Sequence, residues 1–247
     1  MRPPSQHEIL PPRSPPPLPG PVWLTQTWRD MVFVHWPVAP ASVLGLFPDR
    51  TWPATLGGVT YVGIVAFAIP STRVAVLEIG STYELNVRLY SMDDQGRHGV
   101  VFLSMDVTRP DMVLVARVLL RLPYFWSHLE PTRPDPAVSG FRLRRLPSRL
   151  SAAVEIEVDD SVSEPSPLEV FFTSRWGLHT RTVAGTTWVP IAHPPLPVHR
   201  ARLRQGGSAL LTAGGVRVLD EAPVSVLWSP GLDVQVGRPA RMSGRRA

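Results

Sequence analysis

The sequence predicts one mainly β (α+β) domain, in which a large antiparallel sheet is strongly curled or closed and a few short helices accompany it. A continuous apolar run rich in β-branched and aromatic residues spans 59–69. Polar and apolar residues alternate cleanly over 83–90, and turn residues follow. Strand signals recur at short spacing while helix signals are few, and closing such a sheet removes its exposed edges.

The predicted strands follow from these patterns in chain order. The run from Val59 to Ile69 should end at Pro70, because proline has no N–H to give to a strand ladder. The alternating segment 83–90, the turn residues of 93–96 and the segment 99–105 together predict a hairpin. Further strands are expected at 141–146, 152–158, 170–173, 178–183, 186–191 and 223–228.

Three helices are expected. Segment 111–121 has a polar start and apolar positions on most sides, which indicates a buried helix that ends before Pro123. A shorter helix is predicted over 208–213, with Gly214 as its C-terminal stop. Segment 40–47 is the third candidate.

Both ends of the chain have compositions that favour tails. Residues 1–22 are proline-rich, with nine prolines up to Pro21, and such a segment favours an extended conformation with no core to bury. Residues 238–247 are basic and interrupted by glycine and proline. The sequence therefore predicts a disordered tail over 1–22, one domain over 23–237 and a disordered basic tail over 238–247.

The composition excludes several kinds of chemistry. All 25 basic residues are arginine, and there is no cysteine. Arginine stays protonated, so nothing in these residues can form a Schiff base or act as an amine nucleophile. Without cysteine there are no disulfides, thiolate metal sites or cysteine nucleophiles.

Charge and hydropathy also argue against two classes of partner, nucleic acids and membranes. The net charge is +5, but the arginines are scattered and no basic stripe is interleaved with aromatics, so no nucleic-acid partner is expected. No apolar run reaches 18 residues and the N-terminus lacks a signal-peptide core, so we expect no membrane partner and a cytoplasmic location.

Known catalytic and cofactor motifs are missing as well. The seven histidines show no metal-ligand spacing, and there is no Gly-x-Ser-x-Gly or Gly-x-Gly-x-x-Gly pattern. We therefore expect no metal and no cofactor.

Several multi-residue motifs resemble those of one bacterial family. In order they are Gln26-Thr27-Trp28-Arg29, His35-Trp36-Pro37-Val38, Glu84-Leu85-Asn86-Val87-Arg88, Ala116-Arg117, Leu122-Pro123-Tyr124 and the segment from Leu168 to Trp176. The pattern resembles the YqjF-like family of uncharacterised proteins, over roughly 23–236, which is grouped with acetoacetate decarboxylase. The resemblance implies a curled or closed β-barrel of the acetoacetate decarboxylase-like type, and it leaves open assembly into a homo-oligomer.

The resemblance also shows which positions would carry the reactive lysines of the decarboxylase. The decarboxylase carries its reactive amine on a turn with two lysines, and Tyr124 and Phe125 stand at the matching positions. Schiff-base decarboxylation is therefore excluded. Tyr124 could instead donate a hydrogen bond to a substrate carbonyl, or it could simply fill the old site.

The segment around Glu84 has one wholly polar face. On a strand Glu84, Asn86 and Arg88 point to the same side. Such a face is usually solvated, but the resemblance implies that it faces a cavity. Glu84 would then act as acid or base, and Arg88, with Asn86 beside it, as its charge partner and as a clamp for an anion.

Three further residues are site candidates. Arg29 could clamp a carboxylate, or pair with Asp30 at the surface. His35 could face a ligand, although a histidine among aromatics is more often a core residue. His193 lies between a strand and a loop, where chains often line the mouth of a barrel.

Two functions remain open. The first is acid/base catalysis, without a Schiff base, on a small carbonyl or carboxylate compound, by Glu84 and Tyr124 with Arg88 or Arg29 holding the anion. The second is a non-catalytic barrel that binds the same kind of small-molecule ligand. An interaction role for the proline-rich segment has the least support.

Overall fold

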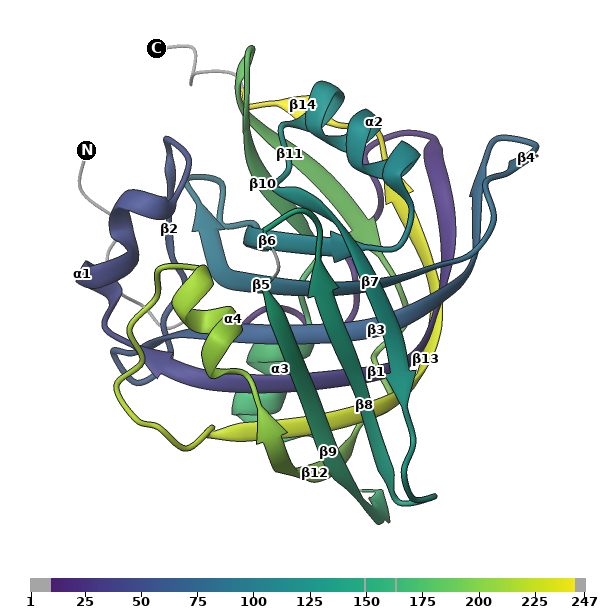
Figure 1. The fold of residues 1–247 in the computed structure, drawn as a ribbon. Coiled ribbons are helices and arrows are strands. Elements are labelled where there is room, and N and C mark those ends of the chain that lie inside the picture. The colour runs from purple at the N-terminus through teal and green to yellow at the C-terminus, as the bar shows by residue number, and fades with distance from the viewer. Residues whose placement is uncertain (1–9, 149, 163, 243–247) are drawn as a thin grey trace.

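The computed structural model describes residues 10–148, 150–162 and 164–242, and the strands of this part of the chain form one 14-stranded sheet. Figure 1 shows the sheet curling around the interior, with α2 at one end and α1 and α4 on one side. The strands are β1 (Val22–Val38), β2 (Thr51–Pro53), β3 (Thr60–Val74), β4 (Leu77–Glu78), β5 (Thr82–Asp93), β6 (His98–Val107), β7 (Tyr124–Thr132), β8 (Val138–Arg145), β9 (Ser151–Val162), β10 (Gly177–Thr182), β11 (Gly185–Ala192), β12 (His199–Gly206), β13 (Ser225–Gly237) and β14 (Ala240–Arg241). The helices are α1 (Pro40–Val43), α2 (Pro110–Leu120), α3 (Pro167–Thr173) and α4 (Ser208–Ala213), with a 3₁₀ turn over Leu44–Leu46.

The sheet closes on itself through two additional pairings. Its main path runs β14-β11-β10-β6-β7-β8-β9-β12-β13-β1-β3-β5-β2, and β5 also pairs with β6 while β11 also pairs with β13. The predicted mainly β fold with a few short helices is confirmed. Two pairs, β6 with β7 and β6 with β10, are parallel. The first of these follows from α2, because a parallel connection needs a crossover segment and α2 supplies it.

The strands β1, β3 and β5 have buried residues on both faces. Leu85, Val87 and Leu89 of β5 join one core cluster, which also holds α4 and the inner residues of β8 and β9. The alternate residue Tyr90 belongs to a second cluster, formed with α2, α3, β10 and β11. The polar face of β5 therefore points into the second half of the interior and not into solvent.

A β-bulge interrupts β1 near Asp30. The backbone φ of Asp30 is 52°, and the register with β3 shifts between Arg29 and Val32. On the other side, Gly231 lies opposite with a φ of 102°, and a Cβ there would lie 1.9 Å from the carbonyl oxygen of Trp28. Only glycine fits that position. The extra residue changes which side chains of β1 face inward.

Strand β3 continues beyond the stop predicted at Pro70. Pairing with β5 ends at Ile69 opposite Thr82, and pairing with β1 resumes at Ser71 after a register shift. Proline is tolerated there because the ladder on one side has ended and the other is irregular. The predicted hairpin of β5 and β6 is confirmed.

The predicted strand 170–173 is wrong, since these residues lie in helix α3. The Ser166 side chain accepts a hydrogen bond from the backbone N–H of Glu169, and the Glu169 carboxylate accepts one from the backbone N–H of Ser166. This capping box, followed by Pro167 at the first helical position, outweighs the strand preference of the valine and phenylalanines that follow.

Helix α2 forms as predicted, but the expectation that it is buried is wrong. Val113 is its buried residue, whereas Leu114, Val115, Val118 and Leu119 are exposed. Helix α4 begins and ends where predicted, with Gly214 at its C-cap. The third predicted helix, 40–47, is α1 followed by the 3₁₀ turn.

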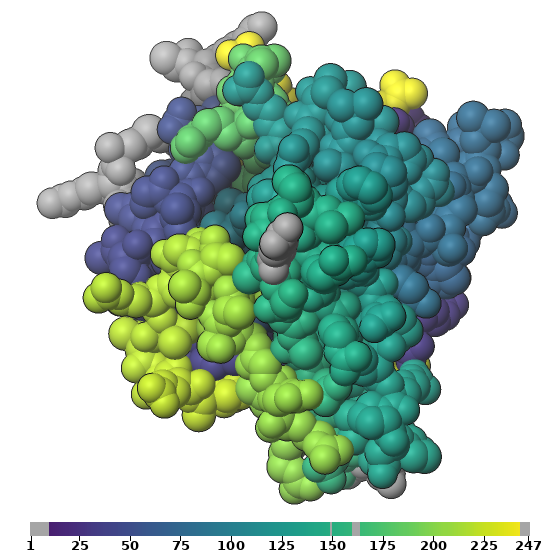
Figure 2. Space-filling view, in the orientation of Figure 1, coloured from purple at the N-terminus to yellow at the C-terminus, as the bar shows by residue number. Residues whose placement is uncertain are grey.

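The described parts of the two predicted tails contact the rest of the molecule. Trp176 Nε1 donates a hydrogen bond to the carbonyl oxygen of Pro12 at 2.9 Å, and β14 pairs with β11. Residues 1–9 and 243–247 lie outside the described residues. Figure 2 shows one face of the molecule, on which the segment around α4 adjoins the strands β7, β8 and β9. None of the described helices has the length and apolar character needed to span a membrane.

Candidate functional site

A cavity of about 150 Å³ lies against the polar face of β5. Apolar side chains from β1, β3, β6, β10 and β11 form much of its wall. Its polar lining residues are Gln26, Glu84, Asn86, Arg88, Tyr124, Thr173, Arg175 and His193. The structure therefore places five of the seven predicted site residues around one cavity.

Glu84 is the central titratable group of this cavity. It is 6% exposed, accepts a hydrogen bond from Asn86 Nδ2 at 3.0 Å and another from the Tyr124 hydroxyl at 3.4 Å. Burial raises the pKa of Glu84 to about 7, against the opposing effects of these hydrogen bonds and of the charge on Arg88. Both protonation states of Glu84 are therefore populated near neutral pH.

Tyr124 is held in place through its backbone. It opens β7 directly after the crossover helix, and Arg117 Nε donates to its carbonyl oxygen at 2.7 Å. Burial, together with the nearby Glu84 carboxylate, raises the pKa of Tyr124 well above its ordinary value. The hydroxyl thus stays protonated and is a hydrogen-bond donor.

Glu84 and Arg88, both described residues, line the cavity, but the expected ion pair between them is not formed. The positive charge of Arg88 nevertheless lowers the pKa of Glu84. The Arg88 guanidinium lies 5.7 Å from the ring centre of Phe33 and 5.6 Å from that of Tyr90. Its Nε is buried and has no hydrogen-bond partner among the described residues.

Arg175 is a second buried cation in the cavity wall, and the sequence reasoning did not select it. Arg175 lies just after the C-terminus of α3. Its Nε donates a hydrogen bond to the carbonyl oxygen of Phe171 at 2.7 Å, and its guanidinium carbon lies 4.1 Å from the centre of the Phe171 ring. Burial lowers the pKa of Arg175 to about 9, and the charge on Arg88 acts in the same direction. Its Nη2 has no hydrogen-bond partner among the described residues. The available signal was its place in the Leu168 to Trp176 motif.

Arg29 and His35 do not line the cavity. Arg29 lies on the opposite side of β1 from its neighbour Trp28, which lines the cavity, because side chains alternate along a strand. Arg29 Nη2 lies 3.5 Å from Asp233 Oδ1 and not beside Asp30. The bulge at Asp30 lets Trp28, before it, and Phe33, after it, both face the cavity. Arg175, and not Arg29, accompanies Arg88 in the cavity wall.

His35 is a core residue. It is fully buried and stacks on Phe172, with ring centres 3.7 Å apart. Burial lowers its pKa well below the ordinary value, and the charge on Arg88 adds to this. A neutral imidazole between aromatic rings fits the structural interpretation of this position.

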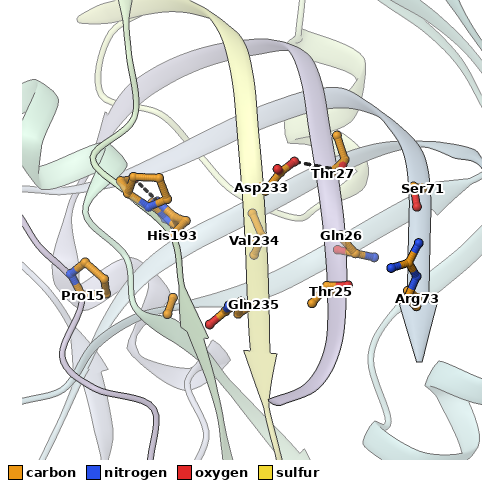
Figure 3. A pocket seen from close by; sticks show the side chains of 12 residues that line it. Pro15, Thr25, Gln26, Thr27, Ser71, Arg73, His193, Asp233, Val234 and Gln235 are labelled. Carbon is orange, nitrogen blue, oxygen red and sulfur yellow. Dashed lines mark hydrogen bonds between the residues drawn. The ribbon is translucent and has the colours of Figure 1, made fainter. Parts of the chain in front are cut away.

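His193 lines the cavity and also a second, open depression on the outside of the sheet. This outer groove has a volume of about 500 Å³. Figure 3 shows His193 beside β13, level with Asp233 and Val234, across from β1 and from Ser71 and Arg73 of β3. The ring of His193 has its Nδ1 2.7 Å from the carbonyl oxygen of Pro194.

A Ser-His-Asp arrangement occurs elsewhere in the interior. Ser91 Oγ lies 2.8 Å from His179 Nδ1, and His179 Nε2 lies 3.1 Å from Asp93 Oδ2. All three residues are at most 1% exposed, and none lines the cavity. A serine nucleophile without room for a substrate cannot act, so this network pins the β5–β6 turn to β10.

A buried ion pair also lies near the cavity. Asp106 accepts hydrogen bonds from Arg145 Nε and Nη2, at 2.8 and 2.6 Å, and from Ser127. Because both partners are satisfied, this pair has no capacity left for a ligand. No group of three potential metal-binding side chains occurs within the described ranges.

These features define a protein with the acetoacetate decarboxylase-like fold. The structure is similar to acetoacetate decarboxylase from Legionella pneumophila, with a TM-score of 0.64 and 13% identity over 93% of this chain and 94% of that one. It is also similar to the enduracididine biosynthesis enzyme MppR complexed with pyruvate, with a TM-score of 0.59 and 14% identity over 90% of this chain and 91% of the other.

The chain belongs to the DUF2071 family, described as "Uncharacterized conserved protein (COG2071)", which matches residues 25–233. The uncharacterized protein YqjF from Bacillus subtilis (strain 168) is 25% identical over 214 residues, which cover 84% of this chain and 88% of that protein. The resemblance inferred from the motifs is thus confirmed.

Proposed function

We propose that the cavity binds a small carboxylate or carbonyl compound, and that Glu84 and Tyr124 catalyse a proton transfer on it without a Schiff base. The observation that supports this most is that one cavity holds both a carboxyl group with a pKa of about 7 and two cations, each with a donor that has no partner among the described residues.

The two arginines favour an anionic ligand. A buried N–H donor without an acceptor costs about 1 to 3 kcal/mol, and more when it is charged. Arg88 Nε and Arg175 Nη2 are two such donors, each buried and without an acceptor among the described residues. The two oxygens of a carboxylate would accept hydrogen bonds from such donors and balance the positive charge.

Glu84 has the properties of a general acid/base. A catalytic acid or base works best when its pKa lies near the working pH, and burial raises the pKa of Glu84 to about 7. A ligand carboxylate held by the arginines would leave its adjacent carbon or carbonyl near Glu84 and Tyr124. Tyr124 would donate a hydrogen bond to the carbonyl oxygen while Glu84 removes or delivers a proton.

The solved neighbours support the ligand class and not the reaction. MppR has been crystallised with pyruvate, a small oxo acid, within a similar fold. Without a lysine, this chain cannot bind such a compound covalently as an imine. A non-catalytic ligand-binding role is the second candidate, favoured by the aromatic residues Tyr124 and Phe125 that stand in place of the reactive turn.

Binding is tested by calorimetry and thermal shift with pyruvate, acetoacetate and lactate, and with acetone as a neutral control. We expect the carboxylates, and not acetone, to raise the melting temperature. Arg175→Gln should weaken carboxylate binding about tenfold or more, because it removes a charged donor. The matched control is Arg29→Gln, which lies outside the cavity and should bind like the unchanged protein.

Catalysis is tested by proton NMR in D₂O, following exchange of the pyruvate methyl hydrogens. The unchanged protein should accelerate the exchange, and Glu84→Gln should not. Binding without exchange would support the non-catalytic role. A protein that binds none of the carboxylates would contradict both functions.

A further inference from the structure

The wall around the cavity has a break along β13. Strand β11 pairs with β13 as far as Ala192 opposite Gln235, and β12 pairs with it from His199 opposite Trp228. Between Trp228 and Gln235, this edge of β13 has no strand partner in the part of the chain that the structure describes. The loop 193–198 crosses the break, so side chains and not a hydrogen-bonded ladder close the wall here.

The outer groove and the inner cavity meet at this loop. His193 and Gln26 are the residues that line both of them. Gln26 lies in continuous β1–β13 pairing opposite Val234, so a passage there would require the ladder to open. A passage at His193 requires only that one side chain rotates. Figure 3 shows His193 at the edge of the groove beside β13.

The imidazole of His193 is packed but not locked. Its ring centre lies 4.8 Å from that of Trp176 and 6.3 Å from that of Trp28. Its one hydrogen bond given by the structure goes to the adjacent residue Pro194, and the side chain is 7% exposed. Rotation of the ring would therefore disrupt no hydrogen bond to another segment.

The groove outside the break has room for a small molecule and is lined by both polar and apolar side chains. Arg73 and Asp233 bring one charge of each sign to it, and Thr25, Thr27 and Ser71 supply hydroxyl groups. At about 500 Å³ it is larger than the inner cavity of about 150 Å³. The charge on Asp233 is compensated by Arg29, 3.5 Å away, so a small anion can approach Arg73 outside the wall, with Arg88 and Arg175 inside it.

We propose that the outer groove is the entrance to the cavity and that His193 is its gate, a side chain that must move for a small anion to pass. This role rests on the cavity being a ligand site, but it does not require catalysis. Its test therefore needs neither the natural ligand nor turnover.

The absence of native cysteine allows a direct test with a single reporter thiol. Val100→Cys places it in the cavity wall, where the residue is 3% exposed. Val154→Cys places a control thiol in the other core cluster, at 0% exposure, where only unfolding would expose it. The probe is 2-sulfonatoethyl methanethiosulfonate, a small anionic thiol reagent, and the measured quantity is the labelling rate of the full chain.

Three changes are then combined with each reporter. His193→Ala removes the gate, His193→Phe keeps a ring of similar size, and Thr27→Ala alters the groove without touching the shared wall. We expect His193→Ala to speed labelling at Val100→Cys about tenfold or more by making local opening easier, while His193→Phe and Thr27→Ala leave it near the original rate.

The reporter in the other core separates gating from loss of structure. If His193→Ala speeds labelling of Val154→Cys to the same extent, the effect is general unfolding and the gate is rejected. An unchanged rate at Val100→Cys in His193→Ala would also overturn it. Failure of carboxylates to bind would count against the proposed function and leave this result unaffected.

Discussion

Glu84 carries an unfavourable charge in the folded protein. Its pKa rises from 4.5 to about 7 on folding, so the folded state binds more protons than the unfolded state between these values. Its contribution to stability is therefore complete below about pH 4.5, falls as pH rises toward 7 and is constant above that. The full cost of the ionised form is on the order of 3 kcal/mol.

Replacing Glu84 by glutamine should therefore stabilise the protein at alkaline pH. Glu84→Gln should unfold at higher urea than the unchanged chain at pH 8, whereas at pH 4.5 the two should be nearly equal. The measurement is urea unfolding at several pH values. A constant difference between the two proteins across this range would show that Glu84 does not titrate with a raised pKa.

We expect Tyr124 to lower the pKa of Glu84 as well as to donate a hydrogen bond to the substrate. Its hydrogen bond lowers the pKa of Glu84, so Tyr124→Phe should raise that pKa above about 7. For any carboxylate that turns over, kcat/KM should fall, and the acid limb of its pH profile should move to higher pH. A lower rate with an unmoved profile would mean that Tyr124 only fills space.

The site shows what could be inferred from single residues. The alternation of β5 was sufficient to place Glu84, Asn86 and Arg88 on one side, because a strand has a period of two. It could not show whether that side faces water. Of the two interpretations of Arg29, the surface position is the one found, with Asp233 and not Asp30 as its partner. The bulge after it reverses the inward and outward positions from Met31 onward, and no local sequence pattern marks it.

At the scale of elements, local signals identified the segments with strong turn or cap residues. The β5–β6 hairpin and α4 were predicted because Gly96 and Gly214 mark their ends. Three long strands, β1, β7 and β12, were not predicted as such. Strands β1 and β7 mix charged, aromatic and proline residues, and β12 has three arginines among its eight residues, so the β structure of all three depends on pairing with distant segments.

Variants of α3 can show whether the helix is stabilised by its N-terminal cap or by the packing of its phenylalanines. Ser166→Ala removes the oxygen that caps Glu169, which should destabilise the protein by about 1 kcal/mol. Ser208→Ala, at the start of α4 where no side-chain cap is present, should change stability by much less. Chemical unfolding of both variants distinguishes them. Equal effects would show that packing of the phenylalanines alone forms α3.

The same helix links folding to the site. Arg175 follows its C-terminus and donates back to the carbonyl oxygen of Phe171, so the helix end orients the guanidinium toward the cavity. The cap at Ser166 and the cavity-lining guanidinium of Arg175 thus lie at the two ends of one short helix.

At the scale of the whole molecule, closing the sheet separates the interior into two halves, and one of them holds the cavity. The strands β1, β3 and β5 divide them, because their two faces belong to different core clusters. In the half without the cavity, burial of apolar side chains stabilises the fold, and the buried charges of Asp106 and Arg145 are paired with each other. The other half holds Glu84 and two arginines, whose desolvation opposes folding.

The central claim is that Glu84 is a carboxyl group that titrates near neutrality inside this cavity. The most direct measurement is the ¹³C NMR titration of its carboxyl carbon, assigned by the signal that disappears in Glu84→Gln. We predict a midpoint near pH 7. A midpoint near the ordinary value of 4.5 would contradict both the burial of Glu84 and its acid/base role.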